Sequence, residues 1–145
     1  MKVVIIIPCY NEADRLDVNK FIDYLSQNTH LHFLFVDDGS TDNTSRIIKQ
    51  IISKCNSMVS LLKNETNKGK AESVRLGVIE SYNMNPDYIG FLDADLAAPI
   101  SEIDKLLKII KKDKTKEVVF ASRIQLIGNE IKRNYLRHLI GRLFA

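Results

Sequence analysis

The stretch that decides the fold is Val3-Val4-Ile5-Ile6-Ile7-Pro8, at the start of the chain. Five consecutive β-branched residues with no polar alternation are typical of a strand that is buried on both faces, as in a parallel sheet. Pro8 has no backbone N–H, so we expect it to end the ladder of this strand. The stretch therefore predicts a strand inside a parallel sheet.

Similar short runs alternate with amphipathic stretches of helical length along the rest of the chain. Further strands are expected at 31–36, 58–62, 88–92 and 117–122, and helices at 70–82, 99–111 and 130–144. Two more helices follow the first two strands. One is capped by Asp17 and buries Phe21, Ile22 and Leu25, and the other is capped by Thr41 or Asp42 and buries Ile47, Ile48, Ile51 and Ile52. This order predicts an α/β fold, a doubly wound and mostly parallel sheet with helices on both faces.

Length and composition are those of an ordinary globular domain. The chain has 145 residues, of which 45% are hydrophobic and 27% charged, so we expect one domain over residues 1–145 and exclude disorder. Cys9 and Cys55 lack the spacing of a zinc site or a redox pair. No apolar run approaches the roughly 20 residues of a membrane span. We therefore expect a soluble, cytoplasmic chain.

The net charge of +3 is unevenly distributed. Residues 1–100 hold 10 basic and 13 acidic side chains, whereas residues 101–145 hold 11 basic and 5 acidic ones. The cationic residues 101–145 could bind a phosphate, an anionic membrane surface or nucleic acid, or their charges could lie on a solvated helix face. Nucleic acid is disfavoured because no aromatic side chains accompany the charge.

Parallel sheets bind ligands beyond the carboxyl ends of their strands, and polar residues follow the first four of the predicted strands. After the first strand, Tyr10 could stack on a flat ring and Glu12 could accept a hydrogen bond, or the segment could be a plain turn. After the second strand stand two adjacent carboxylates, Asp37 and Asp38. The helix cap needs neither of them, so we expect one to face a ligand donor. Lys70, at the start of a predicted helix, could meet a phosphate or could be solvated.

The fourth predicted strand is followed by Asp93-Ala94-Asp95. In an extended segment residues two apart point the same way, so we expect Asp93 and Asp95 to converge. Two close carboxylates repel each other unless a cation or hydrogen-bond donors lie between them. Oxygen ligands suit Mg²⁺ or Mn²⁺, whose coordination shell substrate phosphates can complete. The alternative is a pair of turn-forming aspartates.

Four ordered blocks resemble the inverting glycosyltransferases of family 2, which have the GT-A fold. The blocks are Ile6 to Glu12, Val36 to Asp42, Asn67 to Lys70 with Arg75 and Gly77, and Phe91 to Asp95. Ala121-Ser122-Arg123 and the segment from Asp93 to Pro99 are most similar to the dolichyl- or polyprenyl-phosphate glucose and mannose synthases.

The resemblance implies a role for each matching residue. Pro8, Tyr10, Glu12 and Asp38 would surround the nucleoside of a nucleoside diphosphate sugar, and the backbone of Val36 would contact it. Asp93 and Ala94 would lie against the ribose and diphosphate. Asp95 would be the main metal ligand, and Arg123 would face phosphate. Two positions depart from the pattern, because Ala97 replaces a glutamine of many mannosyl members and Ala71 replaces a second glycine.

Only 50 residues follow Asp95, fewer than in most family members, so we expect a short acceptor side. No recognisable general base lies there, which a phosphate acceptor would not need because it is mostly deprotonated at pH 7. Arg133 and Arg137 lie at the edge of a predicted amphipathic helix that could rest on the cytoplasmic face of a membrane and hold a lipid phosphate. The alternatives are a family 2 transferase with a saccharide acceptor and a catalytically silent nucleotide-binding module.

Overall fold

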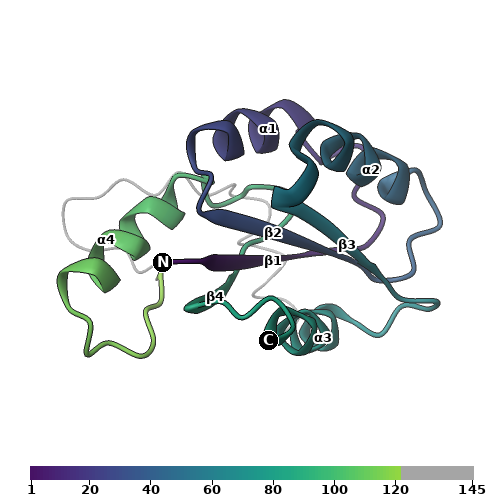
Figure 1. Cartoon of the computed structure of the whole chain (residues 1–145). Helices are drawn as coiled ribbons and strands as arrows, with labels where there is room; N and C mark the ends of the chain where they lie inside the picture. Colours follow the sequence, from purple (N-terminus) through teal and green to yellow (C-terminus); the bar gives the residue numbers. More distant parts are fainter. Residues whose placement is uncertain (122–145) are drawn as a thin grey trace, which may run out of the picture. The chain divides into compact units, whose positions relative to one another are not determined.

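A computed structural model of the chain describes residues 1–121. The chain divides into two compact units, Met1–Glu102 and Ile103–Ala145. The first unit contains a four-stranded sheet with the order β3-β2-β1-β4 (Figure 1). The strands are β1 (Val3–Cys9), β2 (Leu31–Asp37), β3 (Val59–Lys63) and β4 (Tyr88–Phe91). All three strand pairs are parallel, which confirms the predicted fold class.

Pro8 does not end β1, contrary to expectation, because the strand continues to Cys9. In a parallel ladder the N–H and C=O of one residue point toward the same neighbour, and successive residues alternate between neighbours. Ile6 O accepts a hydrogen bond from Leu92 N and Cys9 O accepts one from Asp38 N. Pro8 therefore points toward the β4 side, where pairing stops at Ile6, and its missing N–H breaks no ladder bond.

Helices cover both faces of the sheet (Figure 1). One face carries α1 (Val18–Gln27) and α2 (Thr44–Cys55), which is followed by a 3₁₀ turn, η1 (Asn56–Met58). The other face carries α3 (Lys70–Tyr82). Asp17 caps α1 by accepting from Lys20 N–H, as predicted, and Asp42 Oδ1 accepts from Thr44 N–H at the start of α2.

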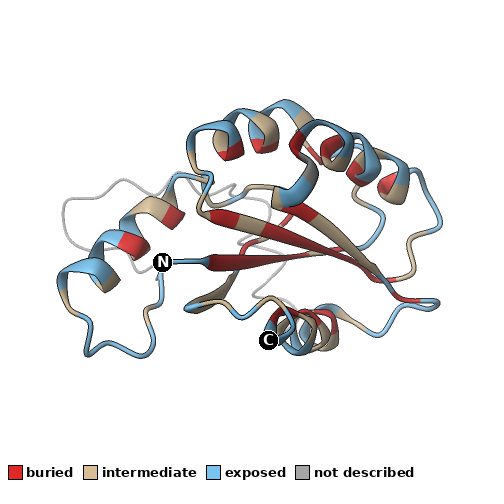
Figure 2. Ribbon diagram, in the orientation of Figure 1, coloured by how far each residue is buried: buried red, intermediate tan, exposed pale blue. Residues whose placement is uncertain are grey.

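The core lies along β1 and β2, which are buried on both faces (Figure 2). Under α1 and α2, Phe21 packs edge-on against Phe33 and Phe35, with ring centroids 5.9 and 5.3 Å away. Ile48 and Ile51 of α2 are fully buried, in agreement with the predicted stripe. Large apolar side chains on both layers therefore hold this face together.

The α3 side is built differently, because the helix faces the sheet with small residues. Its buried residues are Ser73, Gly77 and Ser81. Opposite them lie the fully buried β-branched and leucine side chains of β1 and β2, namely Val4, Ile6, Leu34 and Val36. Small residues let the helix backbone approach the sheet closely.

The second unit is described as far as Ala121. Its helix α4 (Glu102–Lys112) begins three residues later than expected and buries Ile103 and Leu107. Residues 117–121 form no strand, so the expected strand at 117–122 is wrong for its described part. Val118 and Phe120 are 65% and 80% exposed, so the burial that favours an apolar strand is missing. The helix expected at 130–144 lies outside the described residues.

Substitution of Gly77 tests the close packing of α3. A Cβ on Gly77 would lie 2.6 Å from Ile6 Cγ2 and 3.2 Å from Val36 Cγ2. Alanine adds about 1 kcal/mol of helix propensity, but overpacking against two buried β-branched residues costs about 1–3 kcal/mol. We expect Gly77→Ala to lower the free energy of unfolding in urea by up to about 2 kcal/mol. Ile79→Ala, at a half-exposed site on the same helix, should change it by less than about 0.5 kcal/mol. A more stable Gly77→Ala protein would contradict the packing argument.

Candidate functional site

The order of the strands places the candidate site. The chain runs outward from β1 to β2 and β3, then returns to the other side of β1 for β4. The connections reverse direction between β1 and β4, and parallel sheets bind ligands at such a point, beyond the carboxyl ends of the strands. The loops after β1 and β4 therefore flank the expected ligand position.

The loop after β1 is fixed to the loop after β2. Asn11 N–H donates to Ser40 Oγ at 3.0 Å, and Asn11 Oδ1 accepts from Thr41 N–H at 2.9 Å. Glu12 N–H donates to Thr44 Oγ1 at 2.8 Å. Sequence reasoning missed Asn11 and Thr44 as organisers of the site. The available signal was an Asn beside a strand end, because Asn tolerates a positive φ, here 52°.

Several residues that the resemblance assigns to the nucleoside lie along this edge. Pro8 pairs in register with Val36 across β1 and β2. The side chain of Tyr10 projects from the surface and is 45% exposed, so its ring is available for stacking. Ala94 is buried between the two aspartates that follow β4.

Asp37 and Asp38 are both buried, and both accept hydrogen bonds from their own chain. Asp37 Oδ1 accepts from Ser40 N–H at 2.9 Å, and its Oδ2 accepts from the hydroxyl of Ser45. Asp37 thus ties the end of β2 to the start of α2. A polar group buried at 0% exposure requires such partners.

Asp38 connects the β2 loop to the segment before α3. Its Oδ1 accepts from Asn64 Nδ2 at 2.8 Å and from Lys68 N–H at 3.0 Å, and its Oδ2 accepts from Gly69 N–H at 2.7 Å. Burial alone would raise the pKa of Asp38, but these donors favour the carboxylate and hold its pKa below the ordinary value. The sequence offered no signal for Asn64, which lies just beyond β3.

Gly39 allows the same two segments to touch. Its φ is +70°, and a Cβ there would lie 2.7 Å from the carbonyl carbon of Thr66 and 2.8 Å from the nitrogen of Asn67. Both atoms belong to the backbone, so they cannot move aside cheaply. Only glycine fits this position, and the Asp38 contacts depend on that close approach.

The segment after β4 is a turn, so the expectation of an extended Asp93-Ala94-Asp95 is wrong. Leu96 N–H donates to Asp93 O at 3.2 Å, and Leu96 has a φ of 50°. Asp95 Oδ1 accepts from Ala97 N–H at 3.0 Å. The Asp93 carboxylate instead forms an ion pair with the ammonium of Lys70. The two aspartates therefore have different partners.

Glu12 lies in the electrostatic field of Asp95. Burial raises the pKa of Glu12, and Asp95 and Asp42 raise it further, while Arg15, whose Nη2 donates to Oε1 at 2.6 Å, opposes the shift. Glu12 Oε2 is buried without a hydrogen-bond partner. A shallow hollow of about 340 Å³ adjoins this place, lined by residues 14–17, Lys20 and the Asp95–Leu96 turn. An unpartnered carboxylate oxygen beside a second acid favours a ligand donor or a cation here.

The acids at this edge fit a metal that is shared with a ligand. Residues 1–121 contain no group of three or more His, Cys, Asp or Glu side chains that could hold a metal ion by themselves. Mg²⁺ is usually held by only one or two carboxylates, together with water and substrate phosphates. Asp95 and Asp93, two partly exposed carboxylates in the turn after β4, satisfy that requirement. The predicted phosphate residues Arg123, Arg133 and Arg137 lie outside the described residues.

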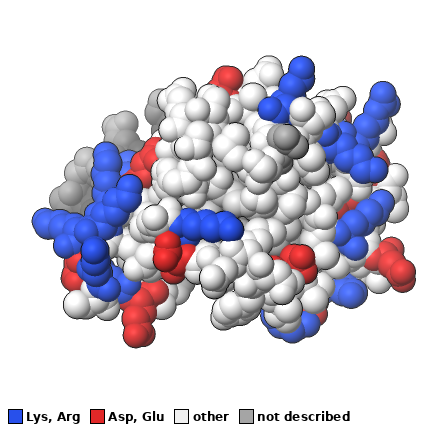
Figure 3. Space-filling view, in the orientation of Figure 1, with Lys and Arg blue, Asp and Glu red and all other residues white. Residues whose placement is uncertain are grey.

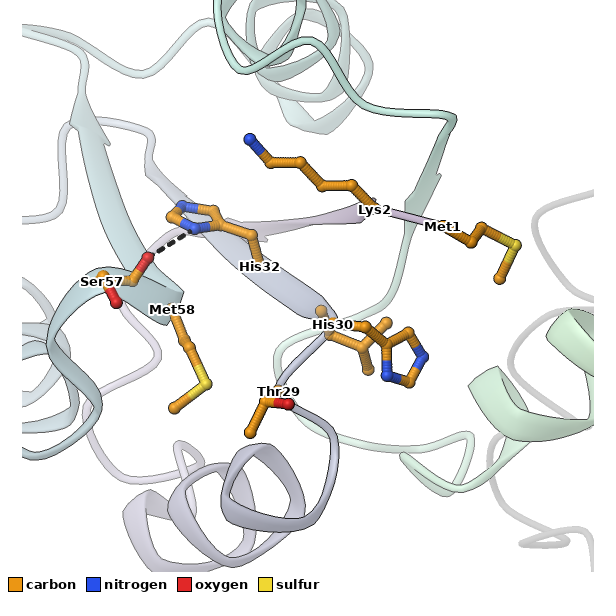
Figure 4. A pocket seen from close by; sticks show the side chains of 8 residues that line it. Met1, Lys2, Thr29, His30, His32, Ser57 and Met58 are labelled. Carbon is orange, nitrogen blue, oxygen red and sulfur yellow. Dashed lines mark hydrogen bonds between the residues drawn. The ribbon is translucent and has the colours of Figure 1, made fainter.

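A second hollow, of about 330 Å³, lies at the opposite end of the sheet. It is lined by residues 1–2, 29–32 and 57–58 (Figure 4). Both ring nitrogens of His32 already have partners, at 3.0 Å from Ser57 O and 2.8 Å from Ser60 Oγ. This hollow lies at the amino ends of the strands, which is not the ligand-binding edge of a parallel sheet.

Comparisons with known proteins agree with this geometry. Residues 4–143 match the family described as Glycosyl transferase family 2. The chain is 35% identical over 123 residues to an uncharacterized protein of Methanocaldococcus jannaschii, a match that covers 83% of this chain and 52% of that protein. It is 30% identical over 149 residues to a dolichyl-phosphate beta-glucosyltransferase of Dictyostelium discoideum, covering 94% of this chain and 45% of that enzyme. The chain thus spans about half the length of these relatives.

The fold matches that of solved glycosyltransferases. A mannosyltransferase of Pyrobaculum calidifontis, solved with GDP-Man and Mn²⁺, superposes with a TM-score of 0.62 at 21% identity, covering 75% of this chain and 32% of that one. At this identity the likeness shows the fold alone, and it confirms the GT-A type of α/β fold. None of the helices within residues 1–121 has the length and apolar character needed to cross a bilayer.

Removal of the Asp38 carboxylate should destabilise the protein. Asp38→Ala leaves the buried Asn64 amide and the Lys68 N–H without an acceptor, whereas Gly69 N–H keeps Asn67 Oδ1, and we expect a loss of about 3 kcal/mol in urea unfolding at pH 7. Because the folded-state pKa is lowered, the native carboxylate contributes its stability above the ordinary value of about 3.9 and loses it as pH falls below that value. Asp38→Asn keeps one acceptor oxygen and should lose less. An Asp38→Ala protein of native stability would refute this role.

Removal of the Glu12 charge should have the opposite effect. A raised folded-state pKa means that native stability is greatest below the ordinary value, about 4.3, and declines as pH rises through the raised pKa. Glu12→Gln should therefore raise Tm at pH 7, and the gain should vanish below about pH 4. Glu72→Gln is the matched control, because its hydrogen bonds from Arg75 lower the pKa of Glu72 and the substitution should not raise Tm. A pH-independent gain for Glu12→Gln would contradict the argument.

Proposed function

The chain belongs to glycosyl transferase family 2, and we propose that it moves a hexose from a nucleoside diphosphate sugar to a polyprenyl or dolichyl phosphate, with inversion at the anomeric carbon. The donor is of the UDP-glucose or GDP-mannose type. One observation carries the proposal: the loops after β1, β2 and β4 and the start of α3 converge on one edge of the sheet. The relative named as a dolichyl-phosphate beta-glucosyltransferase supports the acceptor class.

The nucleoside of the donor is assigned to the edge formed by β1 and β2. The exposed ring of Tyr10 stacks on the base, and Glu12 Oε2 supplies an acceptor that has no partner within the protein. Pro8 and the backbone of Val36 line the same place. Asp38 has its oxygens occupied by Asn64, Lys68 and Gly69, so it shapes the nucleoside site by holding these groups.

The diphosphate is assigned to the turn after β4 and the adjoining start of α3, which the Lys70–Asp93 ion pair joins. Asp93 and Ala94 lie against the ribose and diphosphate, and Lys70 offers an ammonium at the N-terminal end of a helix, where anions are favoured. A Mg²⁺ or Mn²⁺ ion held by Asp95, with Asp93, would neutralise the charge that develops on the leaving diphosphate. Arg123 adds a positive charge at the same phosphate. Asp95 and Arg123 are thus the proposed catalytic residues.

The acceptor is a phosphate and not a sugar hydroxyl. A hydroxyl acceptor needs a general base, whereas a phosphomonoester with a second pKa of about 6 is already deprotonated at pH 7. It needs positive charge instead. Lysines gather over α4, which carries Lys105, Lys108, Lys111 and Lys112 (Figure 3). Arg133 and Arg137 are assigned to the acceptor phosphate, at the cytoplasmic face of a membrane that residues 130–144, expected from the sequence to be helical, would contact peripherally.

Two other functions compete with this proposal. A family 2 transferase acting on a saccharide would use the same donor site with a base elsewhere. A catalytically silent nucleotide-binding module would use the donor site alone. In each case residues 1–145 act as one nucleotide-sugar-binding domain.

Nucleotide titration tests the donor site first. We expect UDP or GDP to bind in calorimetry with Mn²⁺, and chelation or Asp95→Ala to weaken binding by at least about tenfold. Asp23→Ala removes an exposed carboxylate on α1 and should leave affinity unchanged. Equal affinity with and without metal would refute the metal assignment.

Transfer assays with a panel of nucleotide sugars then separate the three functions. Product on polyprenyl phosphate supports the proposal, and Arg133→Ala and Arg137→Ala should reduce it while donor affinity stays native. Product on a saccharide, insensitive to these arginine changes, favours the second function. Nucleotide binding without transfer to either acceptor favours the silent module.

A further inference from the structure

The ion pair between Lys70 and Asp93 joins two separate loops at the candidate site. Lys70 is the first residue of α3, and Asp93 lies two residues beyond the end of β4. By contrast, the ion pairs of Arg15 with Glu12 and of Arg75 with Glu72 join residues three apart on one segment. The Lys70–Asp93 pair therefore depends on the tertiary structure, which brings the two loops together.

The position of Lys70 is set by buried contacts. The amides of Lys68 and Gly69, directly before it, donate to the buried carboxylate of Asp38 at 3.0 and 2.7 Å. Asn67 Oδ1 also accepts from Gly69 N–H at 2.9 Å. With the preceding backbone held in this way, the ammonium lies against Asp93 because the fold directs it there, and a flexible side chain alone does not explain the contact.

The pair itself is easily exchanged. The side chains of Lys70 and Asp93 are 58% and 40% exposed. Exposed ion pairs typically change an equilibrium constant by no more than about fivefold. A more highly charged partner can therefore replace either member at small cost.

Asp93 cannot satisfy two cations equally. Its carboxylate is one of the acids assigned above to the diphosphate and the metal, yet its partner in the structure is an ammonium. A metal ion arriving alone must displace that ammonium and also bear its repulsion. A metal ion arriving with a diphosphate brings an anion that the displaced ammonium can contact.

We propose that Lys70 is the resident counter-ion of Asp93 and passes to the diphosphate when a metal–nucleotide complex binds, so that metal and nucleotide are taken up together. This inference rests on the proposed function. It adds that Lys70 opposes binding of the free metal and supports binding of the complex. Lys70 thus generates positive coupling between the two ligands.

The test measures Mn²⁺ affinity without nucleotide and UDP or GDP affinity with saturating Mn²⁺, by electron paramagnetic resonance and calorimetry. Lys70→Met should raise the affinity for Mn²⁺ alone by about two- to fivefold. It should lower the affinity for the nucleotide by about tenfold, because a charge-assisted contact to phosphate is lost. Lys49→Met removes the same charge from an exposed position on α2, outside the loops assigned to the ligand, and should change neither affinity.

A double-mutant cycle assigns the effect to the pair. In an Asp93→Asn background, Lys70→Met should no longer raise the affinity for Mn²⁺ alone. Because both side chains are exposed, circular dichroism should show native folding of every variant.

The outcomes separate the two proposals. If Mn²⁺ with UDP or GDP binds but Lys70→Met leaves the affinity for Mn²⁺ alone unchanged, the counter-ion role is refuted and the proposed function stands. The same holds if the gain survives in Asp93→Asn. If neither nucleotide binds the native chain with Mn²⁺, the proposed function itself is refuted.

Discussion

The parallel pairing of β1 with β2 on one side and with β4 on the other is the constraint on which the rest of the structure depends. Parallel strands end at the same edge, so this pairing brings the loops after β1 and β4, whose strands end 82 residues apart at Cys9 and Phe91, to one place. It also forces β1 to be buried on both faces, which explains its unbroken apolar sequence. The helices cover the two faces of the sheet: α1 and α2 pack on one face with large side chains, and α3 packs on the other with small ones.

Buried acids hold the loops at that edge and leave other acids exposed for ligands. Asp37 and Asp38 use their oxygens for groups of their own chain, whereas Asp93 and Asp95 lie in a turn at the surface. On burial, Asp37 and Asp38 lose their hydrogen bonds to water and form hydrogen bonds within the protein in their place. Glu12 is intermediate, since one oxygen pairs with Arg15 and the other is buried without a partner. Such an incomplete environment is characteristic of binding sites, where a ligand supplies the missing contact.

Most helices and strands could be predicted from the sequence, because their spacing and capping signals lie within the elements themselves. The boundaries of α3 and the cap of α1 follow from spacing and capping residues. Pro8 inside β1 could not be predicted, because its tolerance depends on which neighbour its nitrogen faces. The apolar residues 118–120 predict a strand, but a strand also needs a buried face. At the site, the acids were identifiable by position. Their partners Asn64 and Lys68 were not, and Lys70 was expected to meet a phosphate and not Asp93, because those contacts join loops distant in sequence.

The central claim is that a metal–nucleotide complex binds at the carboxyl edge of the sheet. Paramagnetic broadening of amide signals by Mn²⁺ in the presence of UDP or GDP tests it most directly. The account predicts broadening confined to residues 10–15, 67–70 and 93–97, with sharp signals for His30, His32 and Ser57 at the opposite edge. Broadening centred on that opposite edge, or broadening that is the same with and without nucleotide, would contradict it.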